Sequence, residues 1–78
     1  MEVVINWHLK RAQHARDRLL LRGISFKEFT DAIKKGRKTK QDKIVYESFW
    51  RYYSIIYEQK VYAEKGIRKV FPITVKIW

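Results

Sequence analysis

The sequence predicts an α+β fold in which two N-terminal helices pack on a three- to four-stranded antiparallel sheet. One observation is a helical spacing in the first third of the chain, at Trp7, Arg11, His14, Arg18 and Arg22. A helix-start signature follows at Ser25, and after Gly36 the side chains alternate with a period of two. Together these patterns predict helices first and strands afterwards.

The first helix is expected from Asn6 to Arg22, with Asn6 as its N-cap and Gly23 directly after its end. Leu9, Ala12 and Leu19 recur at helical spacing and would form its buried face. Residues three and four apart lie above one another on a helix. The basic and aromatic stripe should therefore lie along the border between the core and the solvent.

The second helix is expected from Phe26 to Lys35. Ser25 and Glu28 have the spacing of a capping box, in which each side chain accepts a hydrogen bond from the other residue's backbone. Gly36 is expected to end the helix as its C′ residue.

Strands are expected at residues 42–47, 49–57 and 68–77, which are rich in β-branched and aromatic residues. No helix is expected between Ile44 and Ile77. Pro72 cannot donate to a ladder, so the last strand should lie at an edge or bulge there. Residues 59–63 either continue the central strand or return as a separate one, and the turn at residues 64–66 is the clearest in this region.

Within the expected strand 49–57, alternation places Phe49, Tyr53 and Tyr57 on one side, and Trp50 and Tyr52 on the other. Both sides carry aromatic rings, so one side exposes them unless another chain covers it. Exposed rings interleaved with Arg form a platform on which nucleic-acid bases stack. For any single ring, packing in the core or in a dimer is the more frequent role.

The composition describes a single domain, residues 1–78, with a formal net charge of +10. The chain has no cysteine, which fits a reducing cytoplasm, and no apolar run approaches a membrane span. Two histidines without cysteine make a zinc site unexpected, so no metal or other cofactor is predicted. We expect a soluble cytoplasmic protein.

The excess of Lys and Arg predicts a polyanionic partner, of which RNA is the leading candidate, although a basic surface can also serve solubility alone. Cations at the end of the second helix, Lys34 and Lys35, are explained by the helix dipole. The basic run after it is expected to be a solvated connector that contacts phosphates without sequence preference. Expected nucleic-acid contacts are Arg11, Arg37, Lys38, Lys40, Lys43 and Arg51.

Two short motifs carry a resemblance to a known family. The chain reads His-Ala-x-x-Arg-x-x-x-Arg-Gly-Ile-Ser from His14 to Ser25, and Pro-Ile-Thr-Val from Pro72 to Val75. This pattern resembles a prokaryotic family of small domains of unknown function, which is similar to the BrnT and RelE-type toxins of the barnase/EndoU/colicin/RelE fold group. The resemblance implies ribonuclease activity. It carries over to His14, Arg18, Arg22, Gly23 and Thr74.

Cleavage of RNA without a metal needs groups that move protons and cations that stabilise the charge on the transition state. His14 can move a proton near neutral pH, and Arg18 and Arg22 can clamp a phosphate. A facing tyrosine, Tyr53 or Tyr57, would be the second acid or an orienting group. Against this, a lone histidine on a helix is more often a partly buried polar residue than a catalyst.

Three functions therefore remain open at the level of the sequence. The first is a metal-independent endoribonuclease of toxin type, with catalytic residues His14, Arg18, Arg22, Tyr53 and Thr74. The second is a non-catalytic nucleic-acid-binding module. The third is a protein-interaction module that pairs with an acidic antitoxin, or with a second copy through the sheet or through an open edge strand ending at Ile73 to Trp78.

Overall fold

The computed structural model describes residues 2–77. The elements, in chain order, are β1 (Glu2–Ile5), the 3₁₀ turn η1 (Lys10–Ala12), α1 (Gln13–Arg22), α2 (Phe26–Lys35), β2 (Arg37–Lys40), β3 (Val45–Trp50), β4 (Tyr53–Tyr62), the 3₁₀ turn η2 (Ala63–Lys65) and β5 (Ile67–Ile77). The α+β class and the N-terminal helices are as the sequence predicts.

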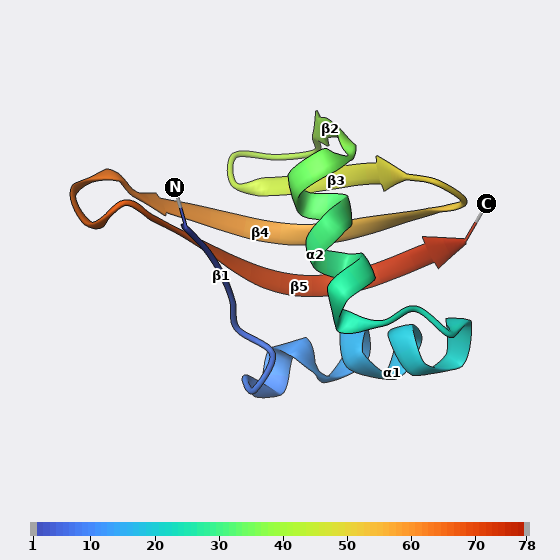
Figure 1. Cartoon of the computed structure of the whole chain (residues 1–78). Coiled ribbons are helices and arrows are strands. Elements are labelled where there is room, and N and C mark those ends of the chain that lie inside the picture. The colour runs from blue at the N-terminus through green and yellow to red at the C-terminus, as the bar shows by residue number, and fades with distance from the viewer. Residues whose placement is uncertain (1, 78) are drawn as a thin grey trace.

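The sheet has five strands in the order β1-β5-β4-β3-β2. Strands β2 to β5 are antiparallel to their neighbours, but β1 runs parallel to β5. The predicted sheet of three or four antiparallel strands is therefore wrong in number and in being purely antiparallel. In Figure 1, α2 crosses one face of the sheet and α1 lies along β5.

The α-helix begins only at Gln13, after the 3₁₀ turn η1, so the expected helix from Asn6 to Arg22 starts several residues too early. The β-branched run Val3 to Ile5 pairs with β5, and the Asn6 amide continues this ladder by donating to the Val70 carbonyl at 3.0 Å. Trp7 packs on the Phe26 and Phe29 rings, with centroid separations of 4.6 and 4.7 Å. Pairing with β5 outweighs the local helical pattern here, because it satisfies backbone groups and buries the apolar run.

Helix α2 has the predicted bounds and the predicted cap. The Glu28 amide donates to the Ser25 hydroxyl at 3.1 Å, and the Ser25 amide donates to the Glu28 carboxylate at 3.0 Å. Gly36 follows the helix in an extended conformation, with φ of −70°, and not in the left-handed one expected of a C′ glycine. A Cβ at Gly36 would lie 2.5 Å from the Ala32 carbonyl oxygen and 2.8 Å from that of Phe49. Close approach of β3, and not the backbone angle, requires glycine at this position.

The expected strand at residues 49–57 is two strands joined by a hairpin turn at Arg51 and Tyr52. Arg51 takes a positive φ of 55°, in a turn without the Gly or Asn that usually marks one. The turn reverses the alternation, so Trp50 pairs with Tyr53 and shares its face, whereas Phe49 faces the other way.

Strand β4 continues through residues 59–62, which resolves the open question about this segment. The turn predicted at residues 64–66 contains η2, so the expectation of no helix after Ile44 is wrong by one 3₁₀ turn. The β4–β5 register shifts between Ile56 and Tyr57, opposite Pro72, which is the bulge alternative for this proline. Strand β5 lies between β4 and β1 only over Ile67–Val70. Among the described residues no strand pairs with the other side of its C-terminal part, and α1 packs against β5. Trp78 lies outside the described residues.

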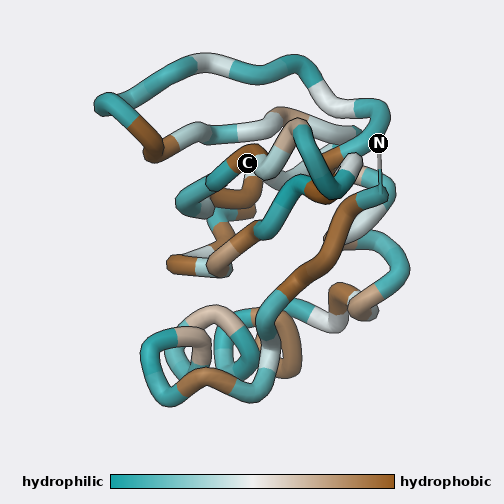
Figure 2. The backbone as a smooth tube through the Cα atoms, turned by 90° about the vertical axis from the view of Figure 1, so that its left-hand side faces the viewer, coloured by the Kyte–Doolittle hydropathy of each residue, from teal (hydrophilic) through white to brown (hydrophobic). Residues whose placement is uncertain are grey.

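The basic run after α2 forms an edge strand where a connector was expected, because Arg37 to Lys40 pair with β3 as β2. Figure 2 shows β2 and the loop after it as a long hydrophilic stretch at the margin of the sheet. Charged residues at an edge discourage pairing with further strands. The core lies between α2, α1 and the sheet, around Leu19, Phe29, Ile33, Ile55 and Tyr57.

Candidate nucleic-acid interface

The two faces of the sheet differ in what covers them. The Ser48 hydroxyl donates to the Ala32 carbonyl at 2.5 Å and the Tyr53 hydroxyl to the Glu28 carbonyl at 2.8 Å, so both residues lie on the face under α2. Residues one position away along each strand point to the opposite face. Within residues 2–77, no helix crosses that opposite face (Figure 1), which we call the helix-free face.

Cations and aromatic rings interleave on the helix-free face. Arg37 lies over the Phe49 ring, at 5.0 Å from its centroid, and Lys69 lies over Tyr62 at 5.2 Å. Phe71 has two cations over it, Arg11 at 5.2 Å and Lys60 at 5.7 Å. These rings are only partly buried, and Tyr62 is 40% exposed. The rings are therefore partly accessible to solvent, with cations beside them.

Of the carboxylates that alternation places on this face, Glu47 and Glu58 have partners, whereas Glu2, on the outer strand β1, is exposed. Glu47 accepts from the Ser54 hydroxyl at 2.7 Å and lies 4.0 Å from the Lys76 ammonium. Glu58 lies 2.6 Å from the Arg11 guanidinium. Neither carboxylate was assigned a role from the sequence. The sequence does contain one indication, because Glu47 is an acid within a stretch of β-branched and aromatic residues in a basic chain. With both acids paired, Arg37, Lys60 and Lys69 have no salt bridge to any described residue.

Of the residues expected to carry catalysis, those of the first helix keep their common side. His14, Arg18 and Arg22 all lie in α1 at intervals of four, so they still form one stripe. His14 and Arg22 are exposed and Arg18 is half-buried. Trp7 and Arg11 leave this stripe, because they precede α1.

Tyr53 is not presented to a substrate. Its side chain is fully buried beneath α2, and its hydroxyl is bound to the Glu28 carbonyl. Burial, with a smaller contribution from the Glu28 carboxylate, raises the pKa of Tyr53 to about 12. Thr74 is half-buried and pairs with Ile56, on the helix-free face. No contact joins Tyr53 or Thr74 to His14 among the interactions of the described residues.

The expected phosphate contacts separate into two regions. Arg37 belongs to the helix-free face, whereas Lys38 alternates to the other side of β2, where its ammonium donates to the Gly36 carbonyl at 3.0 Å. Lys40 and Lys43 are exposed at the margin of the sheet. Arg51 lies in the β3–β4 turn, over the Trp50 ring at 5.6 Å from its centroid.

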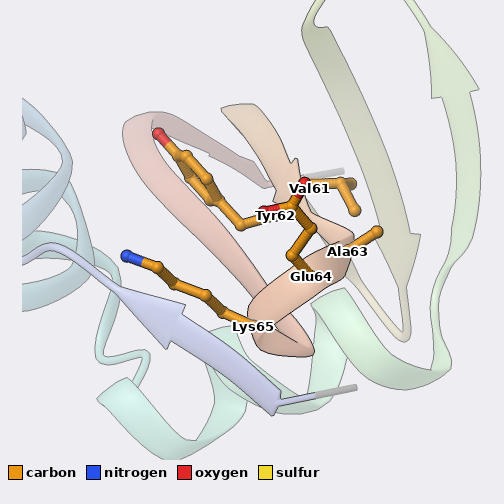
Figure 3. A pocket seen from close by; sticks show the side chains of 5 residues that line it. All are labelled: Val61, Tyr62, Ala63, Glu64 and Lys65. Atoms are coloured by element: carbon orange, nitrogen blue, oxygen red, sulfur yellow. The ribbon is translucent and has the colours of Figure 1, made fainter.

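Figure 3 shows a hollow at the β4–β5 hairpin, lined by Val61, Tyr62, Ala63, Glu64 and Lys65 and with a volume of about 350 Å³. All five lining residues are exposed and belong to the end of β4 and the turn after it. Polar groups from separate elements do not converge there, so the hollow resembles a loop surface more than a catalytic pocket. Residues 2–77 hold no group of three His, Asp or Glu side chains that could bind a metal ion. None of the helices in this part of the chain is long and apolar enough to cross a membrane.

Comparison of the chain with protein-family models, curated sequences and solved structures gave no match. The fold and the helix-free face define an α+β domain with a basic and aromatic sheet surface.

Proposed function

We propose that this domain binds single-stranded RNA on the helix-free face of its sheet. The observation that carries the proposal is the alternation of unpaired cations with accessible rings, Arg37 beside Phe49, Lys60 beside Phe71 and Lys69 beside Tyr62. Bases stack on such rings whatever their sequence, and the cations follow the phosphates. The net charge of +10 adds a long-range attraction for any polyanion.

Fluorescence anisotropy of a labelled single-stranded RNA tests this directly. We expect binding at 50 mM salt that weakens steeply towards 200 mM, because each contacted phosphate contributes about −0.7 to the logarithmic salt slope. The double variant Lys60→Gln/Lys69→Gln should lower the magnitude of that slope by about 1.4, because two contacts of about 0.7 each are lost. Phe71→Ala should weaken binding roughly 5- to 150-fold, the range for loss of one stacked base.

The matched control is Lys34→Gln/Lys35→Gln, which removes the same charge from exposed positions of α2. This control should change affinity much less than the variants of the helix-free face. Equal losses in both double variants would mean that binding follows net charge alone, and would reject the helix-free face as the interface.

A second candidate is metal-independent cleavage of RNA with His14 as the acid or base. It rests on the stripe of His14, Arg18 and Arg22 in α1, in which the histidine is exposed to solvent and has cations one and two turns away. The resemblance to RelE-type toxins supports RNA as the substrate and leaves an acidic antitoxin as a partner to be sought. A homodimer through the sheet is the alternative partner.

His14→Ala should reduce cleavage by about two to four orders of magnitude, the usual contribution of a general acid or base, while RNA binding changes little. His8→Ala is the matched control, because His8 is also exposed but lies outside α1. Products should carry 2′,3′-cyclic phosphate ends and form in EDTA. Full activity in His14→Ala, or loss of cleavage on chelation, would remove this mechanism and leave RNA binding unaffected.

A further inference from the structure

Three polar side chains on the helix side of the sheet have no use in the RNA-binding proposal. Tyr57 and Gln59 are two positions apart on β4, so they share a face. Arg68 of β5 pairs with Val61, the next residue on that same face of β4. Tyr57 shares its face with Tyr53, so this group lies on the side that carries α2 and opposite to the helix-free face.

Each of these side chains has a buried polar atom without a partner. The Tyr57 hydroxyl oxygen, the Gln59 amide oxygen and the Arg68 Nε are all inaccessible to solvent and make no hydrogen bond. Tyr57 as a whole is 0% exposed. Unsatisfied buried groups are rare in native proteins, because each loses its hydrogen bonds to water without replacement. The three lie on neighbouring positions of the adjacent strands β4 and β5, so they form one polar cluster.

The charge around these atoms is positive. Arg68 acts electrostatically on the Tyr57 hydroxyl, and it also acts on the ammonium of Lys38, which projects to this side from β2. Burial, followed by repulsion from Arg68, lowers the pKa of Lys38. No carboxylate contributes to the electrostatics of Lys38 or Tyr57 within the described part of the chain. Arg68 and Lys38 therefore make the potential on this side of the sheet positive, which favours an anion.

We propose that Tyr57, Gln59, Arg68 and Lys38 form a binding site for a single phosphoryl anion on the helix side of the sheet. The Arg68 Nε–H and the Tyr57 hydroxyl can both donate to an acceptor-rich group, and the Lys38 ammonium, which gives one hydrogen to the Gly36 carbonyl, has two more to donate. Burial raises the pKa of Tyr57, which keeps its hydroxyl protonated and able to donate. Gln59 can turn its amide to donate through nitrogen, or can accept from a protonated phosphate oxygen.

A phosphoryl group fits better than a carboxylate because it offers three or more oxygens to donors that arrive from three strands, β2, β4 and β5. The ligand is either inorganic phosphate or the terminal phosphate of a nucleotide. The site is independent of the proposed RNA interface, which lies on the opposite face, so failure of one does not decide the other.

The first experiment follows thermal unfolding of the whole chain in inorganic phosphate and in chloride at equal ionic strength. A ligand that binds only the folded state raises Tm with concentration. We expect a saturable rise in phosphate that chloride does not produce. Equal Tm values in the two salts would mean that the site holds only water, and would overturn the proposal.

Variants then locate the effect. Arg68→Gln should weaken phosphate binding about 10- to 100-fold, and Tyr57→Phe, which keeps the buried ring, about 5- to 10-fold. Lys65→Gln removes one charge from an exposed turn and should leave phosphate binding unchanged. Full phosphate stabilisation in Arg68→Gln and Tyr57→Phe, or an equal loss in Lys65→Gln, would show that the ion binds elsewhere.

A measurement on the unmodified protein guards against variants that fold poorly. In a ¹⁵N NMR titration with inorganic phosphate, the Arg68 Nε–H signal should shift with the same saturation as the Tm rise, and its invariance would contradict the assignment. The two sources of the phosphate are separated with a 5′-phosphorylated trinucleotide and its 5′-hydroxyl counterpart. If the phosphorylated trinucleotide binds more tightly, and Arg68→Gln abolishes the difference, the ligand is the 5′ end of an RNA. If both trinucleotides bind equally while inorganic phosphate still binds, the ligand is free phosphate.

Discussion

The Arg11 guanidinium lies 2.6 Å from the Glu58 carboxylate and also covers the Phe71 ring of β5. Glu58 pairs with Phe71 on the helix-free face, so Arg11 reaches that face from the η1 turn. The contact connects the segment before α1 to the sheet. It also gives a structural role to a residue that the sequence places in a phosphate-binding stripe.

Arg11→Ala should lower the free energy of unfolding by less than about 1 kcal/mol, because side chains that remain partly in water form weak ion pairs. A double-mutant cycle with Glu58→Gln, measured by urea unfolding, should give a coupling energy of about 0.2–1 kcal/mol that declines as salt is added. Absence of coupling at low salt would show that the Phe71 contact alone holds Arg11.

Tyr53→Phe should destabilise the protein by about 1 kcal/mol at neutral pH, since it removes the hydrogen bond that the buried hydroxyl donates to the Glu28 carbonyl. Ser54 has a different hydroxyl contact, to Glu47, so Ser54→Ala serves as a comparison for loss of a buried hydroxyl on the same strand.

The raised pKa of Tyr53 leads us to expect that the free energy of unfolding depends on pH in the alkaline range. The folded-state pKa of about 12 lies above the ordinary value of about 10, so the folded state retains the proton longer than the unfolded chain does. This contribution is fully present below about pH 10 and disappears as the pH rises towards 12. Denaturation measured from pH 9 to 12 should show a steeper loss of stability in the native chain than in Tyr53→Phe; parallel curves would contradict the assignment.

Gly36→Ala should cost about 1–3 kcal/mol, because the added Cβ would lie 2.5 Å from the Ala32 carbonyl oxygen and 2.8 Å from that of Phe49. Both contacts are with backbone, which cannot move aside without separating α2 from β3. Thermal unfolding measures the effect, and Lys35→Ala at the preceding exposed position is the control. A loss no larger than that of Lys35→Ala would mean that α2 and β3 are less closely joined than their contacts indicate.

Ser25→Ala should cost about 1 kcal/mol through loss of the cap at the start of α2. Circular dichroism during thermal unfolding measures it, beside Lys27→Ala in the same exposed turn. Equal effects of the two substitutions would remove the capping box as a source of stability.

Local chemistry was sufficient to predict α2. The capping box and the apolar positions Phe29 and Ile33 act within a few residues of one another, so the bounds of this helix could be obtained without knowing the rest of the fold. The bulge at Pro72 follows in the same way from a missing amide donor.

Pairing between distant segments decided the remainder. Val3 to Ile5 form a strand only because Ile67 to Val70 offer them a ladder, and Arg37 to Lys40 form one because β3 does. The turn at Arg51 carries no local marker, since the cost of its positive φ is met by the pairing of β3 with β4. These were the places where patterns read along the chain gave the wrong element or the wrong face.

For the candidate sites, the charge, the number of aromatic rings and the spacing of His14, Arg18 and Arg22 within one helix follow from the sequence. The position of Tyr53 beneath α2, and of Lys60 and Lys69 beside the Phe71 and Tyr62 rings, depends on the folded structure. The folded structure also places Tyr57, Gln59 and Arg68 on one face, each with a polar atom that has no hydrogen-bond partner. The physical reason is that charge and helical spacing are properties of neighbouring residues, whereas the face a strand residue occupies depends on a register set by partners far along the chain.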